Sequence, residues 1–303
     1  MANCLPLVTA NPSIRHPGQP GYPAALAQAL GARAMPLTVL GQLEEARWSV
    51  AIVGARRASV AGLQAAEQLA AELARRGAMV VSGGAYGVDA AAHRGALAAG
   101  GKTVAVLGTG IDVVYPERHR PLFDQIVAQG GALVSMFADG TPPRAGNFVA
   151  RNALVSGLGQ AVVVVEAEPR SGSLITARWA RKQGRVVCAQ PGSAGTAWLL
   201  GQGAIPVRGA QDVLAAIAGE LTPSARAVPE GDAARVLAAV PTRGGLDEET
   251  LAEALGLSAR AVVRALCSLE LLGLVMAAPG RRYLRTASPS APIARGSCGQ
   301  YPN

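Results

Sequence analysis

Short apolar runs recur through the middle of the chain, each followed by a turn of small residues and a stretch with helical period. The runs are rich in Val, Ile and Ala, which is typical of strands buried on both faces. We expect strands near 50–53, 78–82, 103–107, 132–137, 161–166, 185–189 and 204–207, with helices between them, such as 60–76 and 89–99. This alternation predicts an α/β fold, a doubly wound parallel sheet with right-handed crossovers.

The two ends of the chain depart from this pattern and predict further domains. Residues 1–45 form a partly irregular N-terminal extension, with a short helix at 24–31 and a strand at 36–41, and 46–219 form the main domain. Residues 220–230 contain two prolines and few apolar positions, as a linker does. Residues 231–285 predict helices at 232–240, 247–256 and 259–273 and then a hairpin, the order of a small winged-helix domain. Residues 286–303 lack periodicity and predict a disordered tail.

Five strand-to-helix turns dominate the main domain. In a parallel sheet such turns all lie at the carboxyl edge, where helix N-termini and unpaired backbone N–H groups face outward. That rim suits phosphate. The turns read VAIVGAR (50–56), VVSGGAYG (80–87), VAVLGTG (104–110), VVVVEAEPRSGS (162–173) and VVCAQPGS (186–193).

Residues of several turns are candidates for binding phosphate. A glycine permits close backbone approach, and an arginine beside it can fork onto a phosphate. The alternatives are a tight turn with a solvated arginine and, for Asp89 and His93, a capping carboxylate and a packed imidazole instead of an oriented catalytic histidine. We expect Ser173 to cap its helix. The candidate contacts are Gly54 and Arg56; Ser82, Gly83 and Gly84; Asn147, Arg151 and Asn152; and Ser171, Gly172 and Ser173.

Other chemistries have little support in the sequence. The GTG turn at 108–110 lacks the third glycine of a dinucleotide fingerprint, since Val113 stands there, and no G-x-x-x-x-G-K-[ST] occurs. No nucleophile, base and acid form a set, so we expect no catalytic activity. With three histidines and four scattered cysteines, we expect no metal and no cofactor. Without a long apolar run or a secretory signal, we expect a cytoplasmic protein that does not contact membranes.

The charge of the chain is unevenly distributed. The net charge is +8, and residues 46–220 carry 17 basic and 11 acidic side chains of the 28 and 20 in the whole chain. An excess of positive charge favours a polyanionic partner through counterion release. Solvated arginines on helix faces would give the same count, so both interpretations stay open.

Several segments together resemble the DNA-processing protein A family (DprA, also called Smf), which are bacterial recombination mediators. They are VAIVGARRAS, VVSGGAYGVDAAAHRGALAAGGKTVAVLGTGIDVVYPERHR, GNFVARN, VVVVEAEPRSGSLITARWA and GRVVCAQPGS, in the family's order. The resemblance implies an extended Rossmann-like domain that binds single-stranded DNA through the candidate contacts given above. It also implies a homodimer without catalytic activity that protects incoming DNA and loads RecA onto it during natural transformation.

The chain departs from the family's pattern at a few positions. Tyr86, Met136 and Ala153 replace residues that are arginine or acidic in many members, and the segment 193–207 is short. In the winged helix, Arg260, Arg264, Arg281 and Arg282 would face a DNA groove, or the domain binds protein or only packs on its own core; these alternatives stay open.

A nucleotide or nucleoside-phosphate hydrolase of the lonely-guy type is the alternative function. Its signature P-G-G-x-G-T-x-x-E is similar to residues 191–196, but Leu199 occupies the glutamate position. Glu166 and Glu168 are candidates to replace that glutamate.

Overall fold

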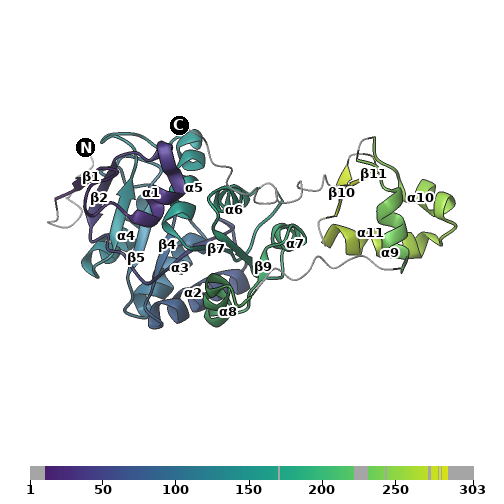
Figure 1. Cartoon of the computed structure of the whole chain (residues 1–303), viewed down its shortest axis with the longest axis horizontal. Coiled ribbons are helices and arrows are strands. Elements are labelled where there is room, and N and C mark those ends of the chain that lie inside the picture. Colours follow the sequence, from purple (N-terminus) through teal and green to yellow (C-terminus); the bar gives the residue numbers. More distant parts are fainter. Residues whose placement is uncertain are drawn as a thin grey trace, which may run out of the picture. The chain divides into compact units, whose positions relative to one another are not determined.

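The protein is described here by a computed structural model covering residues 11–169, 171–221, 231–242, 244–271, 274–278, 280 and 282–285. The chain divides into two compact units, Met1–Ala227 and Val228–Asn303 (Figure 1). Most of the linker expected at 220–230 lies outside the described residues, as does the tail expected to be disordered at 286–303.

A nine-stranded sheet forms the first unit, in the order β1-β2-β6-β5-β4-β3-β7-β8-β9. All pairings among the seven strands β3 to β9 are parallel, which confirms the doubly wound α/β fold. The strands β3, β4, β5 and β6 follow one another toward one edge of the sheet. β7 then pairs with the other side of β3, and β8 and β9 continue toward the opposite edge. The strands are β1 (Ser13–Arg15), β2 (Leu37–Gly41), β3 (Trp48–Val53), β4 (Ala78–Ser82), β5 (Thr103–Val106), β6 (Ala132–Ser135), β7 (Ala161–Val164), β8 (Val186–Ala189) and β9 (Ile205–Pro206).

Helices cover both faces of this sheet, which explains the continuous apolar runs. Along β3, Val50 and Ile52 enter the core beneath α2, α3 and α8, while Ala51 and Val53 enter the core beneath α1, α5, α6 and α7. Each strand therefore needs apolar side chains at successive positions. The helices are α1 (Ala24–Leu30), α2 (Val60–Arg75), α3 (Val88–Ala98), α4 (Arg120–Ala128), α5 (Ala145–Leu158), α6 (Gly172–Lys182), α7 (Ala194–Gly201) and α8 (Ala210–Ala218), with 3₁₀ turns at Gly31–Arg33 and Glu117–His119.

One edge of the sheet is antiparallel. β2 pairs antiparallel with β6, and β1 pairs antiparallel with β2. The sequence predicted a strand at 36–41 but neither its direction nor the three residues of β1. The N-terminal segment extends the sheet by pairing with residues far away in the sequence. The local pattern of apolar residues therefore does not predict the direction of β2 or the presence of β1.

The second unit has its own apolar core, formed by residues such as Val236, Leu251, Val262 and Leu266. Its elements are α9 (Gly231–Ala239), α10 (Glu248–Leu255), α11 (Ala259–Leu271), β10 (Val275–Ala278) and β11 (Arg282–Arg285). β10 and β11 pair as an antiparallel hairpin, and Leu246 adds a bridge to Tyr283. Three helices followed by this wing confirm the predicted winged-helix fold. Among the described residues of both units, no helix has the length and apolar character needed to cross a bilayer.

Candidate nucleic-acid interface

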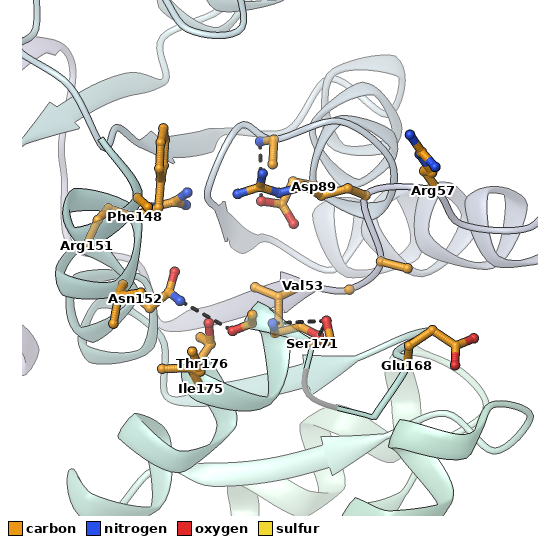
Figure 2. Close-up of a pocket in the computed structure, with 18 of the residues that line it drawn as sticks. Val53, Arg57, Asp89, Phe148, Arg151, Asn152, Glu168, Ser171, Ile175 and Thr176 are labelled. Atoms are coloured by element: carbon orange, nitrogen blue, oxygen red, sulfur yellow. Dashed lines mark hydrogen bonds between the residues drawn. The ribbon is translucent and has the colours of Figure 1, made fainter. Parts of the chain in front are cut away.

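A cleft of about 720 Å³ opens at the carboxyl ends of β3 and β7. The strand order reverses between these two strands, which is where open α/β sheets place their ligands. Figure 2 shows Phe148, Arg151 and Asn152 entering the cleft from α5, with Ser171, Ile175 and Thr176 at the start of α6. The remaining lining includes Val53–Arg57, Ala85, Asp89, Tyr115, Pro143, Ala145, Val149, Glu168, Pro169, Gly172 and Ser173.

The turn after β3 forms one wall of the cleft. Gly54 lacks a side chain because a Cβ there would lie 2.6 Å from Val88 Cγ2 and 2.8 Å from the Glu166 carbonyl oxygen. Close packing of α3, and not only ligand approach, therefore requires this glycine. The Ala55 N–H donates to the same carbonyl at 2.7 Å, which ties the turn to the end of β7. Arg56, next in the turn, is exposed.

Glu166 stabilises the start of α2. Its Oε1 accepts from the Ser59 N–H at 2.9 Å and its Oε2 from the Ser59 hydroxyl at 2.6 Å. Ser59 also caps α2 by accepting from the Gly62 N–H at 3.0 Å. The carboxylate that was a candidate acid of a hydrolase is thus occupied by a structural contact.

Aromatic rings line the wall that belongs to α5. Phe148 lies against Gly108, where a Cβ would be 2.5 Å from its ring, so this glycine of the GTG turn seats an aromatic side chain. The Tyr115 ring is 5.5 Å from that of Phe148, centroid to centroid. Arg56 and Arg151 place their guanidinium carbons 5.7 and 5.9 Å from the Phe148 centroid. The cleft therefore combines two aromatic rings with two cations.

Arg151 is a buried cation at the cleft, with 4% of its surface exposed. Its Nε is buried without a hydrogen-bond partner among the described residues. Two ion pairs form among the residues that the structure describes, Lys102–Glu44 and Arg235–Asp232, and neither includes Arg151. Burial lowers the pKa of Arg151, Asp89 opposes this and Arg56 adds to it. An arginine still keeps its proton at neutral pH, so a positive charge is buried beside the carboxylate of Asp89 and makes no ion pair within 4.0 Å.

Asp89 is the carboxylate whose negative charge acts on the pKa of Arg151. Its Oδ2 accepts from the Ala85 N–H at 3.3 Å and so holds the turn that precedes α3. Burial raises the pKa of Asp89, and Arg151 together with hydrogen bonds from the turn opposes that rise. The carboxylate has a structural role, but the expected cap is wrong: Gly87 is the N-cap of α3, which has no side-chain cap hydrogen bond, and Asp89 holds the preceding turn instead.

His93, one turn further along α3, is fully buried. Its Nδ1 lies 2.7 Å from the Thr103 hydroxyl, which itself donates to the Val80 carbonyl at 2.8 Å. The hydroxyl therefore accepts from His93, and the proton of the neutral imidazole is on Nδ1. Burial, with His119 and Arg151 contributing, lowers the pKa of His93 to about 3. A neutral, buried imidazole packs the core, as the structural interpretation expected.

The N-terminus of α6 forms the third wall. Ser171, not Ser173, is its N-cap, so the expected cap is wrong by two residues. The Ser171 hydroxyl accepts from the Ser173 N–H at 3.3 Å and lies 2.8 Å from the Ser173 hydroxyl. Asn152 Nδ2 donates to the Gly172 carbonyl at 3.3 Å, which joins α5 to α6. A Cβ on Gly172 would meet nothing within 4 Å, so this helix end is open.

The structure brings together most of the predicted contacts. Those that line the cleft are Gly54, Arg56, Arg151, Asn152, Ser171, Gly172 and Ser173. Ser82, Gly83 and Gly84 instead lie buried beneath it, and the Ser82 hydroxyl donates to the Ile52 carbonyl at 2.6 Å. This turn is therefore part of the support and not an open anion nest, which corrects its expected role. Asn147 is half-buried outside the cleft lining, with Nδ2 3.4 Å from the Pro142 carbonyl.

Tyr115 lines the cleft but was not among the candidate residues predicted from the sequence. Tyr86 is exposed, but its ring packs edge-on against His119 at 4.8 Å and does not line the cleft. The available signal for Tyr115 was its place just after the GTG turn. The separation of more than thirty residues from Phe148 hid their contact.

Residues of the segment similar to the lonely-guy signature have structural roles. Leu199, at the position of the lonely-guy glutamate, is 1% exposed and belongs to the core. Ser193 and Thr196 of the similar segment form a capping box at the start of α7. Within the described residues, no three His, Cys, Asp or Glu side chains come together as a metal site would require.

The fold defines an α/β protein with a cleft at the switch point of its sheet and with a winged-helix unit. The family described as DNA recombination-mediator protein A matches residues 13–218, and the DprA winged helix domain matches residues 220–281. The chain therefore belongs to the DNA recombination-mediator protein A family and is a DNA-processing protein.

Relatives and solved structures agree with this assignment. The chain is 41% identical over 294 residues to a Mycobacterium tuberculosis protein named for DNA processing, DprA, covering 89% of this chain and 75% of that one. It is similar to the X-ray structure of Streptococcus pneumoniae DprA, with TM-score 0.62, 39% identity, and coverage of 67% and 73%. It is also similar to a Helicobacter pylori DprA structure, with TM-score 0.62, 30% identity, and coverage of 70% and 98%. The description of that structure concerns its single-stranded DNA binding mode.

Proposed function

We propose that this protein is a single-stranded DNA-binding recombination mediator and that the cleft between β3 and β7 holds the strand. The observation that carries the proposal is Arg151, a buried guanidinium that lines the cleft and whose Nε has no partner among the described residues. Removing a charge from water is costly unless an opposite charge compensates it. Asp89 compensates this charge only in part, because it makes no ion pair with Arg151, and a phosphate entering the cleft adds a second negative charge.

The surrounding groups suit a nucleotide strand better than an isolated anion. Arg56 is exposed beside the cleft, and the open N-terminus of α6 presents backbone N–H groups to a phosphate. Phe148 and Tyr115 offer ring faces on which bases stack, without preference for sequence. Because cationic side chains and helix N–H groups would contact the phosphates while the cleft offers only two rings for stacking, we expect the binding affinity to fall steeply as the salt concentration rises.

The family assignment and this site together support a proposal about the partners. We infer that the protein acts in the cytoplasm as a homodimer, protects incoming strands during natural transformation and loads RecA onto them. The role is that of a binding protein and not of an enzyme. The H. pylori relative, described by its single-stranded DNA binding mode, supports the strand as ligand.

Titration of a labelled oligothymidine strand by fluorescence anisotropy tests the proposal. We expect binding by the wild-type chain and at least a tenfold loss in Arg151→Gln, because a charge-assisted contact contributes about 1.5–3 kcal/mol. Arg94→Ala is the matched control, since Arg94 is exposed on α3 and does not line the cleft. Equal affinities for wild type and Arg151→Gln would refute the cleft as the binding site. RecA loading onto the bound strand is the assay that follows.

A further inference from the structure

Tyr86 presents its ring to solvent just outside the cleft, in the turn between β4 and α3. The residue is 45% exposed, although it is one of the large side chains of the chain. Its ring meets that of His119 in a T-shaped contact, with 4.8 Å between the centroids. A T-shaped contact covers at most one face of the tyrosine ring. The ring therefore has a free face that a ligand can cover.

The support beneath Tyr86 is buried and fixed. His119 is 4% exposed, and its Nδ1 lies 2.9 Å from the Gly84 carbonyl oxygen. Because a carbonyl only accepts, this nitrogen carries the proton. The ring of Phe123 lies 6.1 Å from that of His119, and a Cβ on Gly84 would be 2.9 Å from the Phe123 ring. Tyr86 thus rests on a packed imidazole, and a ring held in this way loses little freedom when a ligand binds.

The turn that carries Tyr86 touches the turn that carries Arg56. The Val88 N–H donates to the Ala55 carbonyl at 3.2 Å. A Cβ on Gly87 would be 2.7 Å from the Arg56 carbonyl oxygen, so the two backbones are in contact there. Tyr86 is the residue before Gly87. It therefore adjoins the arginine for which we propose a phosphate contact.

Arg56 stands between rings that come from opposite faces of the sheet. Phe148 belongs to α5, which covers one face, whereas Tyr86 precedes α3 and His119 precedes α4, and both of these helices cover the other face. The Arg56 guanidinium carbon is 5.7 Å from the Phe148 centroid, and the Arg56 backbone adjoins the turn of Tyr86. A single strand whose phosphate binds Arg56 thus has an aromatic ring on each side of that phosphate.

The surroundings of Tyr86 suit a base better than a second phosphate. Glu117 and Arg118 are both exposed in the 3₁₀ turn Glu117–His119, so opposite charges stand together beside the ring. Every base has a π-face, and stacking on an aromatic side chain tolerates any sequence. An uncharged base therefore gains from the ring without needing an excess of positive charge.

We propose that Tyr86 forms a base-binding subsite outside the cleft, on which a nucleobase of the single strand stacks beside the phosphate held by Arg56. This inference rests on the proposed function and extends it to the opposite face of the sheet. The contact uses a ring and no charge. Its contribution to affinity is therefore independent of salt but requires a base on the strand.

The test compares the full-length wild type with Tyr86→Ala on two labelled probes, oligothymidine and an abasic strand of the same length, at low salt and over a salt series. We expect Tyr86→Ala to bind oligothymidine about tenfold more weakly. The slope of log affinity against log salt stays at the wild-type value, because no phosphate contact is lost. On the abasic strand, which offers nothing to stack, Tyr86→Ala and wild type bind alike.

Two further variants serve as controls for this comparison. Tyr86→Phe keeps the ring, and we expect its affinity for oligothymidine to stay within twofold of wild type. Ile14→Ala removes a large apolar side chain that is 64% exposed on β1, outside the cleft lining, and we expect it to change neither affinity.

Two results overturn the subsite while leaving the proposed function intact. One is equal oligothymidine affinity in wild type and Tyr86→Ala. The other is an equal loss on both probes, because the substitution would then act on the phosphate contacts or on the turn itself. Absence of oligothymidine binding by the wild type is a distinct outcome, which refutes the proposed function and this inference with it.

Discussion

The guanidinium of Arg151 occupies the space that a side chain on Gly83 would take. A Cβ on Gly83 would overlap Arg151 Nη1, and Asp89 Oδ2 would be 2.7 Å from it. The turn after β4 therefore supports the cleft from below. Its glycine leaves room for a buried cation beside a buried carboxylate, and this explains why a residue expected to touch phosphate acts through Arg151 instead.

Gly83→Ala tests this support. The added methyl group displaces the Arg151 side chain, so we expect oligothymidine affinity to fall about tenfold and stability to fall by about 1–3 kcal/mol, as for an overpacked core. Anisotropy titration and urea unfolding measure the two effects. Gly209→Ala is a suitable control, because its Cβ would be 3.4 Å from Glu72 Oε2, an ordinary contact remote from the cleft lining. Unchanged affinity in Gly83→Ala would contradict the account.

The coupling between Asp89 and Arg151 predicts a rescue. Arg151→Met leaves a buried carboxylate without its neighbouring cation, and adding Asp89→Asn removes that carboxylate. We expect the double variant to be more stable than the sum of the single changes implies, by roughly 1–3 kcal/mol. Urea unfolding of the four proteins gives the coupling energy. Strict additivity would show that the two charges do not interact.

The pH dependence of Arg151→Met gives an independent check. The pKa of Asp89 is raised in the fold, so this group favours folding below its ordinary pKa, and that contribution is lost as the pH rises through the folded-state value. Without Arg151 the folded pKa rises further. We therefore expect the stability deficit of Arg151→Met to shrink on acidification from pH 7 to pH 5. A deficit that is constant over this range would contradict the assignment.

His93 has the opposite dependence on pH. Its pKa falls from 6.5 to about 3 in the fold, so its contribution to stability is complete above pH 6.5 and is lost as the pH falls toward 3. We expect His93→Gln, which retains a donor for Thr103, to reduce the acid-induced loss by up to about 1.4 kcal/mol per pH unit. Urea unfolding between pH 4.5 and 6.5 measures the slopes. Parallel slopes for both proteins would disprove a neutral, buried His93.

A substitution of Glu166 distinguishes a structural role of its carboxylate from a catalytic role in a hydrolase. Because its carboxylate binds both the N–H and the hydroxyl of Ser59, we expect Glu166→Ala to lower stability by about 1–2 kcal/mol. Glu168→Ala, on the same rim but exposed, is expected to change stability by less than about 0.5 kcal/mol. Thermal unfolding distinguishes the two. Base release from a nucleoside monophosphate that depends on Glu166 would instead favour the hydrolase.

Much of the fold could be predicted from the sequence because its strands are buried on both faces. Runs such as 161–165 carry apolar residues at every position, and the glycine turns between strands and helices are locally encoded. The antiparallel pairing of β2 with β6 could not be predicted, since it joins segments about ninety residues apart.

The site was predicted less completely, for two physical reasons. Burial depends on neighbours from other strands: the Ser82 hydroxyl faces Ile52 and not solvent. The helix start at Ser171 depends on backbone geometry that two nearby serines could each satisfy. By contrast, Arg56 and Arg151 line the cleft as expected: Arg56 follows the glycine turn after β3, and Arg151, inside α5, lies in the segment GNFVARN that resembles the family.

The most direct test of the central claim is the salt dependence of oligothymidine binding in wild type and Arg56→Ala, with Arg94→Ala as control. The account predicts that Arg56→Ala weakens binding to all sequences alike and reduces the slope of log affinity against log salt by about one charge. The control is expected to keep the wild-type slope. A wild-type slope in Arg56→Ala would contradict a phosphate contact at this cleft.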